Sequence, residues 1–324
     1  MTREIGVLCM SYGTARGLED VERYYTHIRG GRPPDALHLE ELKERYRAIG
    51  GRSPLIEITE SQVGWIEREL NEAERLRGSE RTFRAYHGMK HQTPYLEEAV
   101  VTMADDGVRD AVGLVLAPHY SRMSVGAYVE RAGKAAAEAG IDFSFVEHWH
   151  DDPDFIRFTM FRVAEAIGRL PEEERSRAPV VFSAHSLPAR IVDEGDPYPA
   201  QLEESALLVG REVGLPPDRV RVAWQSAGRT GEPWLGPDLT EVLRELAVEG
   251  HAAAVSCPIG FVSDHLEILY DIDIEAQQVA RQLGMTLVRT DSPNEDPVFL
   301  RALAGVVRRH LAERENAADS GSSP

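Results

Sequence analysis

Three carboxylates near the C-terminal third of the chain have a spacing that suits a path for a cation. His265 opens a segment in which Glu267, Asp271 and Glu275 follow one another at four-residue intervals. In a helix these three side chains lie on one face, in a row about 12 Å long. Like charges at this spacing oppose helix stability, so the row predicts a metal path. The alternative is a solvated acidic face.

A histidine stands at the end of a buried strand in another part of the chain. His185 follows directly after the apolar run Val180–Ala184. Open parallel sheets bind their ligands just beyond the carboxyl ends of the strands, and a neutral imidazole there can take a proton or a metal. We therefore expect His185 and Glu267 to meet across one cleft. A histidine bonded to a nearby carbonyl oxygen is the alternative.

The elements that must position these residues alternate between strand and helix. In the first half the predicted strands are Ile5–Met10, Thr82–His87, Ala111–Pro118 and Phe143–Glu147, and the predicted helices are Asp35–Ile49, Glu57–Leu76, Tyr95–Asp106 and Val125–Ala139. In the second half the predicted strands are Val180–Ala184, Val220–Gln225, Ala252–Cys257 and Thr286–Thr290, and the predicted helices are Phe155–Leu170, Tyr198–Val213, Asp238–Glu249, Asp264–Leu283 and Pro297–Arg314. Such alternation predicts an α/β fold of two Rossmann-like domains, each a mainly parallel sheet flanked by helices, with a cleft between them. We expect the domains to cover residues 1–150 and 151–314, and residues 315–324 to form a disordered tail.

Composition narrows the classes of function. The chain has 324 residues and a formal net charge of −18, which is unfavourable for binding nucleic acid. It has no apolar run long enough to span a membrane and no secretory signal, so we expect a cytoplasmic protein without membrane insertion. Nucleotide-binding and zinc-protease motifs are absent from the sequence.

Ten blocks in order along the chain resemble the ferrochelatase family, and most of all the coproporphyrin III ferrochelatases of Gram-positive bacteria. The blocks are Met10–Thr14, Tyr24–Arg32, Arg45–Leu55, Gly88–His91, Leu116–Ser121, Ser183–Pro188, Gly195–Pro199, Trp224–Ser226, Trp234–Pro237 and Cys257–Asp271. The resemblance implies the chelatase fold, with a porphyrin in the cleft. It also implies an enzyme that inserts Fe²⁺ into coproporphyrin III, releases two protons and gives coprohaem.

The resemblance also implies roles for the residues at matching positions. His185 is the expected base and inner contact for Fe²⁺, and Glu267 is its partner as ligand or second proton acceptor. Asp271 and Glu275 would form an outer site that can hold Mg²⁺, with Arg45 nearby. Tyr12 would be an axial ligand to the product iron from the opposite face of the ring. The positions matching porphyrin contacts are Arg29, Arg45, Tyr46, Ser53 and Tyr128, and His91 is an accessory candidate.

The remaining expectations concern cofactors and partners. Two cysteines, Cys9 and Cys257, are too few for the [2Fe–2S] cluster of some relatives, so we expect no cluster and no tightly bound cofactor. We expect a transient contact with the next enzyme of the haem pathway. His148 and His150 look like a metal pair, but the sequence shows no third ligand, and we interpret them as structural.

Two alternative functions remain open at this point. One is a ferrochelatase that uses protoporphyrin IX, against which the resemblance argues because the chain lacks the apolar lip and membrane-binding extension of those enzymes. The other is a tetrapyrrole carrier that does no catalysis, since a two-domain α/β cleft is common among binding proteins. A carrier needs the arginines and Tyr12 but has no need for a metal path.

Overall fold

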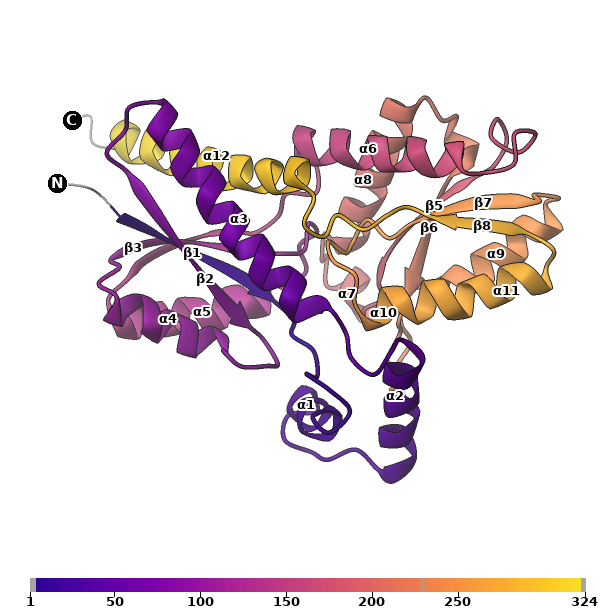
Figure 1. Ribbon diagram of the computed structural model, residues 1–324, viewed down its shortest axis with the longest axis horizontal. Helices are drawn as coiled ribbons and strands as arrows, with labels where there is room; N and C mark the ends of the chain where they lie inside the picture. Colours follow the sequence, from indigo (N-terminus) through magenta and orange to yellow (C-terminus); the bar gives the residue numbers. More distant parts are fainter. Residues whose placement is uncertain (1–3, 229, 322–324) are drawn as a thin grey trace.

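Two four-stranded parallel sheets form the frame of the molecule, seen in a computed structural model that describes residues 4–228 and 230–321 (Figure 1). The first sheet has the order β2-β1-β3-β4 and the second has the order β6-β5-β7-β8. The strands of the first sheet are β1 (Glu4–Ser11), β2 (Thr82–Met89), β3 (Asp110–Val115) and β4 (Asp142–Val146). Those of the second are β5 (Val180–His185), β6 (Val220–Gln225), β7 (Ala253–Cys257) and β8 (Thr286–Arg289). The predicted α/β fold with two parallel sheets is confirmed.

The two sheets repeat one topology, and this fixes where a ligand can bind. In each sheet the first strand in the chain, β1 or β5, lies between the second and the third. Chain connections diverge from such a strand, and open α/β sheets bind ligands at the carboxyl ends beside this point. Tyr12 follows the end of β1, and His185 is the last residue of β5. Both residues therefore stand at the switch points of their sheets.

Helices cover both faces of each sheet, as expected for parallel strands that are buried on both sides. On the first sheet, α3 (Leu55–Leu76) and α12 (Pro297–Gly321) lie on one face, and α4 (Leu96–Asp105) and α5 (Val125–Ala139) lie on the other (Figure 1). On the second, α6 (Pro153–Gly168) and α8 (Tyr198–Val213) cover one face, and α9 (Leu239–Val248) and α11 (Gln277–Gln282) cover the other. Two short elements also belong to this half, α7 (Arg190–Asp193) and the 3-10 turn η1 (Pro217–Arg219).

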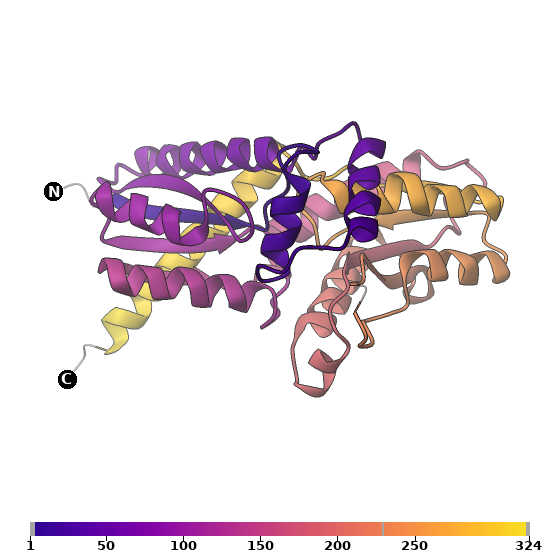
Figure 2. The same cartoon turned by 90° about the horizontal axis from the view of Figure 1, so that it is seen from below.

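A pair of helices projects from the junction of the two halves. These are α1 (Val21–Ile28) and α2 (Ala36–Ala48), which both Figure 1 and Figure 2 show beside the place where the halves meet. The small core of this pair contains Val21, Tyr24 and Tyr46, and Leu266 from the second half packs against it. The pair therefore lies against the segment that carries the predicted metal path.

The predicted helix Asp264–Leu283 is wrong as a single α-helix. The segment forms α10 (Leu266–Leu269), the π-helical turn η2 (Asp271–Ala276) and then α11. In the π turn the amide of Glu275 donates to the carbonyl oxygen of Tyr270, five residues earlier, at 2.9 Å. Such π segments insert one residue per turn and occur often at functional sites.

The last helix corrects the expected division of the chain. We expected residues up to 314 to belong with the second sheet and residues 315–324 to form a disordered tail. Instead α12 continues to Gly321 and packs on α3 and the first sheet as well as on α6. Arg314 donates to Asp110 at 2.8 Å and to Asp142 at 2.5 Å, and Glu315 pairs with Arg81 at 2.5 Å. These ion pairs and an apolar stripe hold the helix; residues 322–324 lie outside the described part of the chain.

No helix among the described residues is both long and apolar enough to cross a membrane.

Candidate functional site

His185 and Glu267 meet, although they lie 82 positions apart in the chain (267 − 185). The Nε2 atom of His185 lies 3.6 Å from Oε1 of Glu267, and both side chains are about one-third exposed. His185 lies at the end of β5, and Glu267 lies in the first turn of α10, which follows β7. Because β5 and β7 are neighbours in the sheet, their carboxyl ends bring the two groups together.

The backbone around His185 sets the state of its ring. The Nδ1 atom contacts the carbonyl oxygen of Ser186. A carbonyl oxygen can only accept a hydrogen bond, so Nδ1 carries the proton and the neutral ring keeps a free lone pair on Nε2. Tyr198 donates its hydroxyl to the carbonyl oxygen of His185 at 3.0 Å and fixes the strand end. The ring thus presents a proton or metal acceptor toward Glu267.

Two imidazoles keep Glu267 ionised. Burial alone would raise the pKa of its carboxyl group, but the positive charges of His185 and then His265, when these rings are protonated, lower it to about 2. His265 Nε2 lies 3.5 Å from Oε2 of Glu267, and this carboxylate raises the pKa of His265 against the effect of burial. The main chain of Glu267 is also held, since Gln225 donates to its carbonyl oxygen at 3.1 Å. A fixed negative charge therefore faces His185 at neutral pH.

The predicted row of carboxylates is present, carried across the π turn. Burial, and then the charge of Glu267, raises the pKa of Asp271 to about 6, with Glu275 adding to the effect. Ser226 donates to Asp271, and Arg45 of α2 lies 3.4 Å from its other oxygen. Asp271 is buried, whereas Glu275 is exposed. The row thus runs from the His185–Glu267 pair outward to solvent.

Tyr12 directly follows β1 of the first sheet, and the residue is 42% exposed. Its ring packs 4.6 Å from that of His91, and the amide of His91 donates to the Tyr12 carbonyl oxygen at 3.0 Å. Gly13 adopts a φ of +88°, and a Cβ there would lie 2.9 Å from the Cβ of Gln92, so the turn after Tyr12 requires glycine. Partial desolvation of the hydroxyl by the surrounding protein, and then the charge of Glu267, raises the pKa of Tyr12. Tyr12 is therefore a neutral phenol within electrostatic reach of the pair.

His91 is a neutral ring beside this tyrosine. Its Nδ1 lies 3.0 Å from Nδ1 of His27, so one ring donates and the other accepts. Burial, and then the charges of Lys90 and His27, lowers the pKa of His91 to about 3. The ring supports Tyr12 through contact and contributes no charge at neutral pH.

Tyr46 and Ser53, two of the predicted porphyrin contacts, use their hydroxyl groups in hydrogen bonds within the protein. The hydroxyl of Tyr46 accepts from the amide of Ala15 at 3.2 Å and shares a hydrogen bond of 2.7 Å with Thr14. Ser53 is buried, and its oxygen accepts from the amide of Leu55 at 3.4 Å. In this structure Tyr46 holds the loop after Tyr12, and Ser53 holds the start of α3.

The other predicted contacts occupy different surroundings. Arg29 is exposed at the end of α1, with its guanidinium 5.7 Å from the ring centre of Tyr25. Arg45 is turned toward Asp271, which suits the outer site better than a porphyrin carboxylate. Tyr128 is buried, and the ammonium of Lys90 lies 5.2 Å from its ring centre.

Sequence reasoning missed three members of the site. Lys90 lies 6.0 Å from the ring centre of Tyr12 and supplies a cation there. Its signal was its place directly after the second strand, next to His91. Ser226 contacts Asp271, and His265 contacts Glu267. Ser226 is distant from Asp271 in the sequence, and only the fold brings the two together. His265 was visible two residues before Glu267, but no periodic pattern places such a neighbour in contact.

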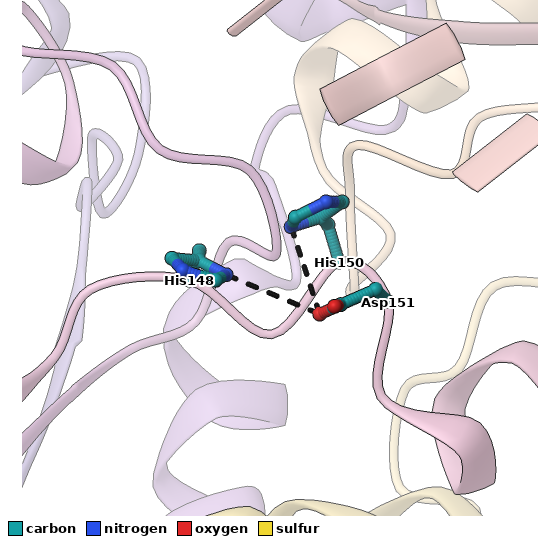
Figure 3. A group of neighbouring side chains, drawn as sticks. All are labelled: His148, His150 and Asp151. Carbon is teal, nitrogen blue, oxygen red and sulfur yellow. Dashed lines mark ion pairs between the residues drawn. The ribbon is translucent and has the colours of Figure 1, made fainter. Parts of the chain in front are cut away.

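The expectation that His148 and His150 have no third metal ligand nearby is wrong. Asp151 lies in the same loop, and the donor atoms of all three side chains fall within 4.8 Å of one another (Figure 3).

Comparison with known proteins identifies the family. The sequence profile described as Ferrochelatase matches residues 4–311. The chain is 48% identical to a coproporphyrin III ferrochelatase of Geobacillus kaustophilus over 95% of its own length and 96% of the relative's. It is 47% identical to one from Bacillus subtilis, with 95% and 98% covered, and 46% identical to a ferrochelatase of Deinococcus radiodurans, with 96% and 97% covered.

Solved structures agree at the level of the fold. The chain superposes on SirB from Bacillus subtilis, solved with Fe³⁺, with a TM-score of 0.57 at 13% identity, covering 97% and 98% of the two chains. For CbiX, the terminal enzyme for siroheme biosynthesis in denitrifying bacteria, the TM-score is 0.52 at 12% identity, covering 94% and 98%. With its profile matched over nearly the whole length and its relatives nearly half identical, the chain belongs to the ferrochelatase family.

Proposed function

We propose that this ferrochelatase inserts Fe²⁺ into coproporphyrin III to give coprohaem. The observation that carries the proposal is the pair formed by His185 and Glu267, with Nε2 and Oε1 3.6 Å apart at the carboxyl edge of the second sheet. The curated relatives that carry this substrate in their names support the choice of porphyrin.

The two groups divide the work of the reaction. Fe²⁺ replaces the two pyrrole N–H protons of the porphyrin, so two protons must be accepted. The free lone pair on Nε2 of His185 can take one proton, and the imidazolium formed is stabilised by the adjacent Glu267 carboxylate. Because the His185 side chain is about one-third exposed, it can release this proton to solvent and then accept the second one. With a pKa of about 2, Glu267 is a weak base at neutral pH and is better suited to holding the cation. One imidazole and one carboxylate bind Fe²⁺ more weakly than thiolate ligands would, so the metal can pass on to the porphyrin.

Tyr12 would act on the other face of the ring as axial ligand to the product iron. Because its pKa is raised, the phenol keeps its proton until iron displaces it. His91 packs against the ring and fixes its direction.

The four carboxylates of the substrate need local cations on a protein of net charge −18. We propose Lys90 and Arg29 for this role, with Tyr128 and the segments held by Tyr46 and Ser53 shaping the surface around them. Lys90 is the cation closest to Tyr12 among the contacts described above. Arg45 would act on the outer carboxylates instead.

Asp271 and Glu275 would form the outer station, where a hydrated Mg²⁺ can bind. The crowding of negative charge that raises the pKa of Asp271 is the feature that such a cation would relieve. We further propose that the enzyme carries no [2Fe–2S] cluster, because its two cysteines are buried in different sheets. It would work in the cytoplasm and hand its product to the next haem-pathway enzyme through a transient contact.

The test is anaerobic Fe²⁺ insertion followed by absorbance, with coproporphyrin III and protoporphyrin IX side by side. We expect faster turnover of the tetra-acid, and we expect His185→Ala to lower the rate by about 10²–10⁴-fold. His38→Ala, a histidine on α2 outside the site, serves as the matched control. Preference for the di-acid would overturn the substrate, and tight binding without turnover would favour a carrier.

A further inference from the structure

A loop far from the catalytic pair in sequence brings three metal-ligand side chains together. It joins β4 to α6 and contains His148, His150 and Asp151 (Figure 3). The Oδ1 atom of Asp151 lies 4.0 Å from Nδ1 of His148 and 3.9 Å from Nδ1 of His150. Both imidazoles thus direct a nitrogen at one carboxylate oxygen.

The buried member of this group has a nitrogen without a hydrogen-bond partner. His150 is 4% exposed, and its Nδ1 makes no hydrogen bond among the described residues. Its Nε2 lies 3.1 Å from the Glu204 carboxylate. A carboxylate only accepts, so Nε2 carries a proton, and Nδ1 is the nitrogen left free to bind a cation. The buried Nδ1, without a partner in the described part of the chain, and the Asp151 oxygen 3.9 Å away leave a gap that a metal ion can bridge.

The contact with Glu204 has the form that supports metal-binding histidines. Such residues usually donate their second ring nitrogen to a carboxylate, which fixes the tautomer and increases the basicity of the ligating nitrogen. Here Glu204 comes from α8, a different element from the loop. The ring of His150 is therefore held from outside the loop in the orientation that a metal needs.

The backbone of the loop is fixed by residues between and beside the ligands. Trp149 points into the core. Its Nε1 donates to the carbonyl oxygen of Val115 at 3.1 Å, and its backbone amide donates to the carbonyl oxygen of Pro118 at 3.0 Å. Asp152 caps the start of α6 by accepting from the amides of Asp154 and Phe155 at 3.0 and 3.2 Å. With both anchors in place, little backbone entropy would be lost when an ion binds.

We propose that His148, His150 and Asp151 bind a divalent transition-metal ion of the Zn²⁺ type. Two imidazoles and one carboxylate suit this class and are poorly suited to Mg²⁺ or Ca²⁺, which prefer oxygen ligands. Bonds of about 2.0–2.1 Å place tetrahedral donor atoms about 3.3 Å apart, so the present separations close with shifts of less than about 1 Å. The side chains of His148 and Asp151 are about half exposed, at 49% and 51%, and have the freedom to move. Water would complete the coordination.

This site is separate from the pair that acts on iron. The ring of His119 lies 5.9 Å from that of His150, and the ring of Tyr198 lies 6.2 Å from that of His119. The hydroxyl of Tyr198 in turn donates to the carbonyl oxygen of His185. The two sites share no ligand. Removing the catalytic pair should therefore leave metal binding at the loop intact, and this allows the two sites to be measured apart.

The experiment uses the full-length chain carrying His185→Ala and Glu267→Gln, stripped with chelator and titrated with Zn²⁺ against a chromophoric chelator. Co²⁺ serves as a second probe, since its visible bands report nitrogen ligation and tetrahedral geometry. We expect one ion per chain, and we expect His148→Ala and Asp151→Asn each to lower the affinity at least about tenfold. Zn²⁺ should also raise the melting temperature of the parent but not of either variant.

His38→Ala is the matched control, because His38 is also a half-exposed histidine that pairs with an aspartate three residues away. It should leave Zn²⁺ affinity unchanged. The substituted side chains of both loop variants are half exposed, so both proteins should fold. Equal Zn²⁺ affinity in the parent, His148→Ala and Asp151→Asn would overturn the proposal, as would Co²⁺ bands unchanged by both substitutions.

Discussion

Glu267 and Asp271 lie four residues apart, yet the protein shifts their pKa values in opposite directions. Asp271 is buried and Glu267 is partly buried, and removal from water by itself disfavours the charged form of both. Two imidazoles face Glu267 and lower its pKa to about 2, whereas Glu267 itself faces Asp271 and raises the pKa of that group to about 6. The inner carboxylate is thus a permanent charge, and the next one outward changes its charge near neutral pH. A cation moving along the row meets stronger attraction as it approaches His185.

Replacing Glu267 by glutamine tests this inner charge. The amide keeps the shape of the side chain but removes the charge opposite Nε2 of His185, so we expect Fe²⁺ insertion to slow by about 10²–10³-fold. Porphyrin binding, measured by fluorescence quenching without metal, should change little. Glu275→Gln, at the exposed end of the same row, should leave the rate within about threefold of wild type. Equal losses in both variants would contradict a special role for the inner carboxylate.

Lys90 gives the porphyrin side of the site a pH dependence. Burial, and then the charge of Arg131, lowers the pKa of the ammonium to about 8. The group is therefore charged below this pH and becomes neutral above it. If it receives a substrate carboxylate, KM for coproporphyrin III should rise about tenfold as the pH increases through 8, the cost of one charge-assisted hydrogen bond.

Two variants separate this effect from other titrations. Lys90→Met should show the high KM at every pH, and Lys90→Arg should keep a low KM on both sides of the transition because a guanidinium stays charged. The measurement is KM against pH by initial rates at saturating Fe²⁺. A wild-type profile that persists unchanged in Lys90→Met would rule Lys90 out.

At the scale of elements, the strand ends could be predicted and the contacts between them only in part. Apolar runs that stop at Tyr12 and His185 are visible in the sequence, and parallel strands leave their carboxyl ends at one edge. The pairing of His185 with Glu267 follows from this. The π turn η2 could not be predicted in this way. A helical turn with one extra residue shifts the spacing of apolar residues by only one position, which the sequence pattern does not distinguish from an α-helix. The contact of Ser226 with Asp271 depends on how β6 meets that turn.

The fit between the loop after β7 and the end of β5 positions His185. The amide of Gly260 donates to the carbonyl oxygen of Ser183 at 3.1 Å. A Cβ added at Gly260 would lie 2.5 Å from the Cβ of Ala184 and 2.9 Å from its Cα. Gly260→Ala must therefore displace the strand end that carries His185. A misplacement of about 1 Å lowers catalysis by about 10²-fold, so we expect a loss in kcat of that order. Gly168→Ala, where no atom lies within 4 Å of the added carbon, is the control. Full activity in Gly260→Ala would show that the strand end tolerates the shift.

At the scale of the molecule, one apolar core joins the two sheets. The largest cluster includes Val7 of β1 and Phe182 of β5, together with residues of α3, α6 and α12. The sequence divides into two similar halves, and for that reason we assigned α12 to the second. Its return to the first sheet could not be predicted, since the apolar stripe of a helix does not specify which of two similar surfaces it covers. The packing of α12 makes the halves interdependent.

Phe299 of α12 tests whether the halves unfold together. The side chain is fully buried, with its ring 6.1 Å from that of Trp149 and 5.5 Å from that of Phe158, so Phe299→Ala should cost about 3–5 kcal/mol. Because the core is shared, we expect calorimetry to show a single transition at a lower temperature, with calorimetric and van't Hoff enthalpies still equal. Val298→Ala removes an exposed neighbour on the same helix and should change stability by less than about 0.5 kcal/mol. If α12 merely covered one half, the Phe299→Ala melt would split into two transitions, and the half that carries His185 and Glu267 would keep its original melting temperature.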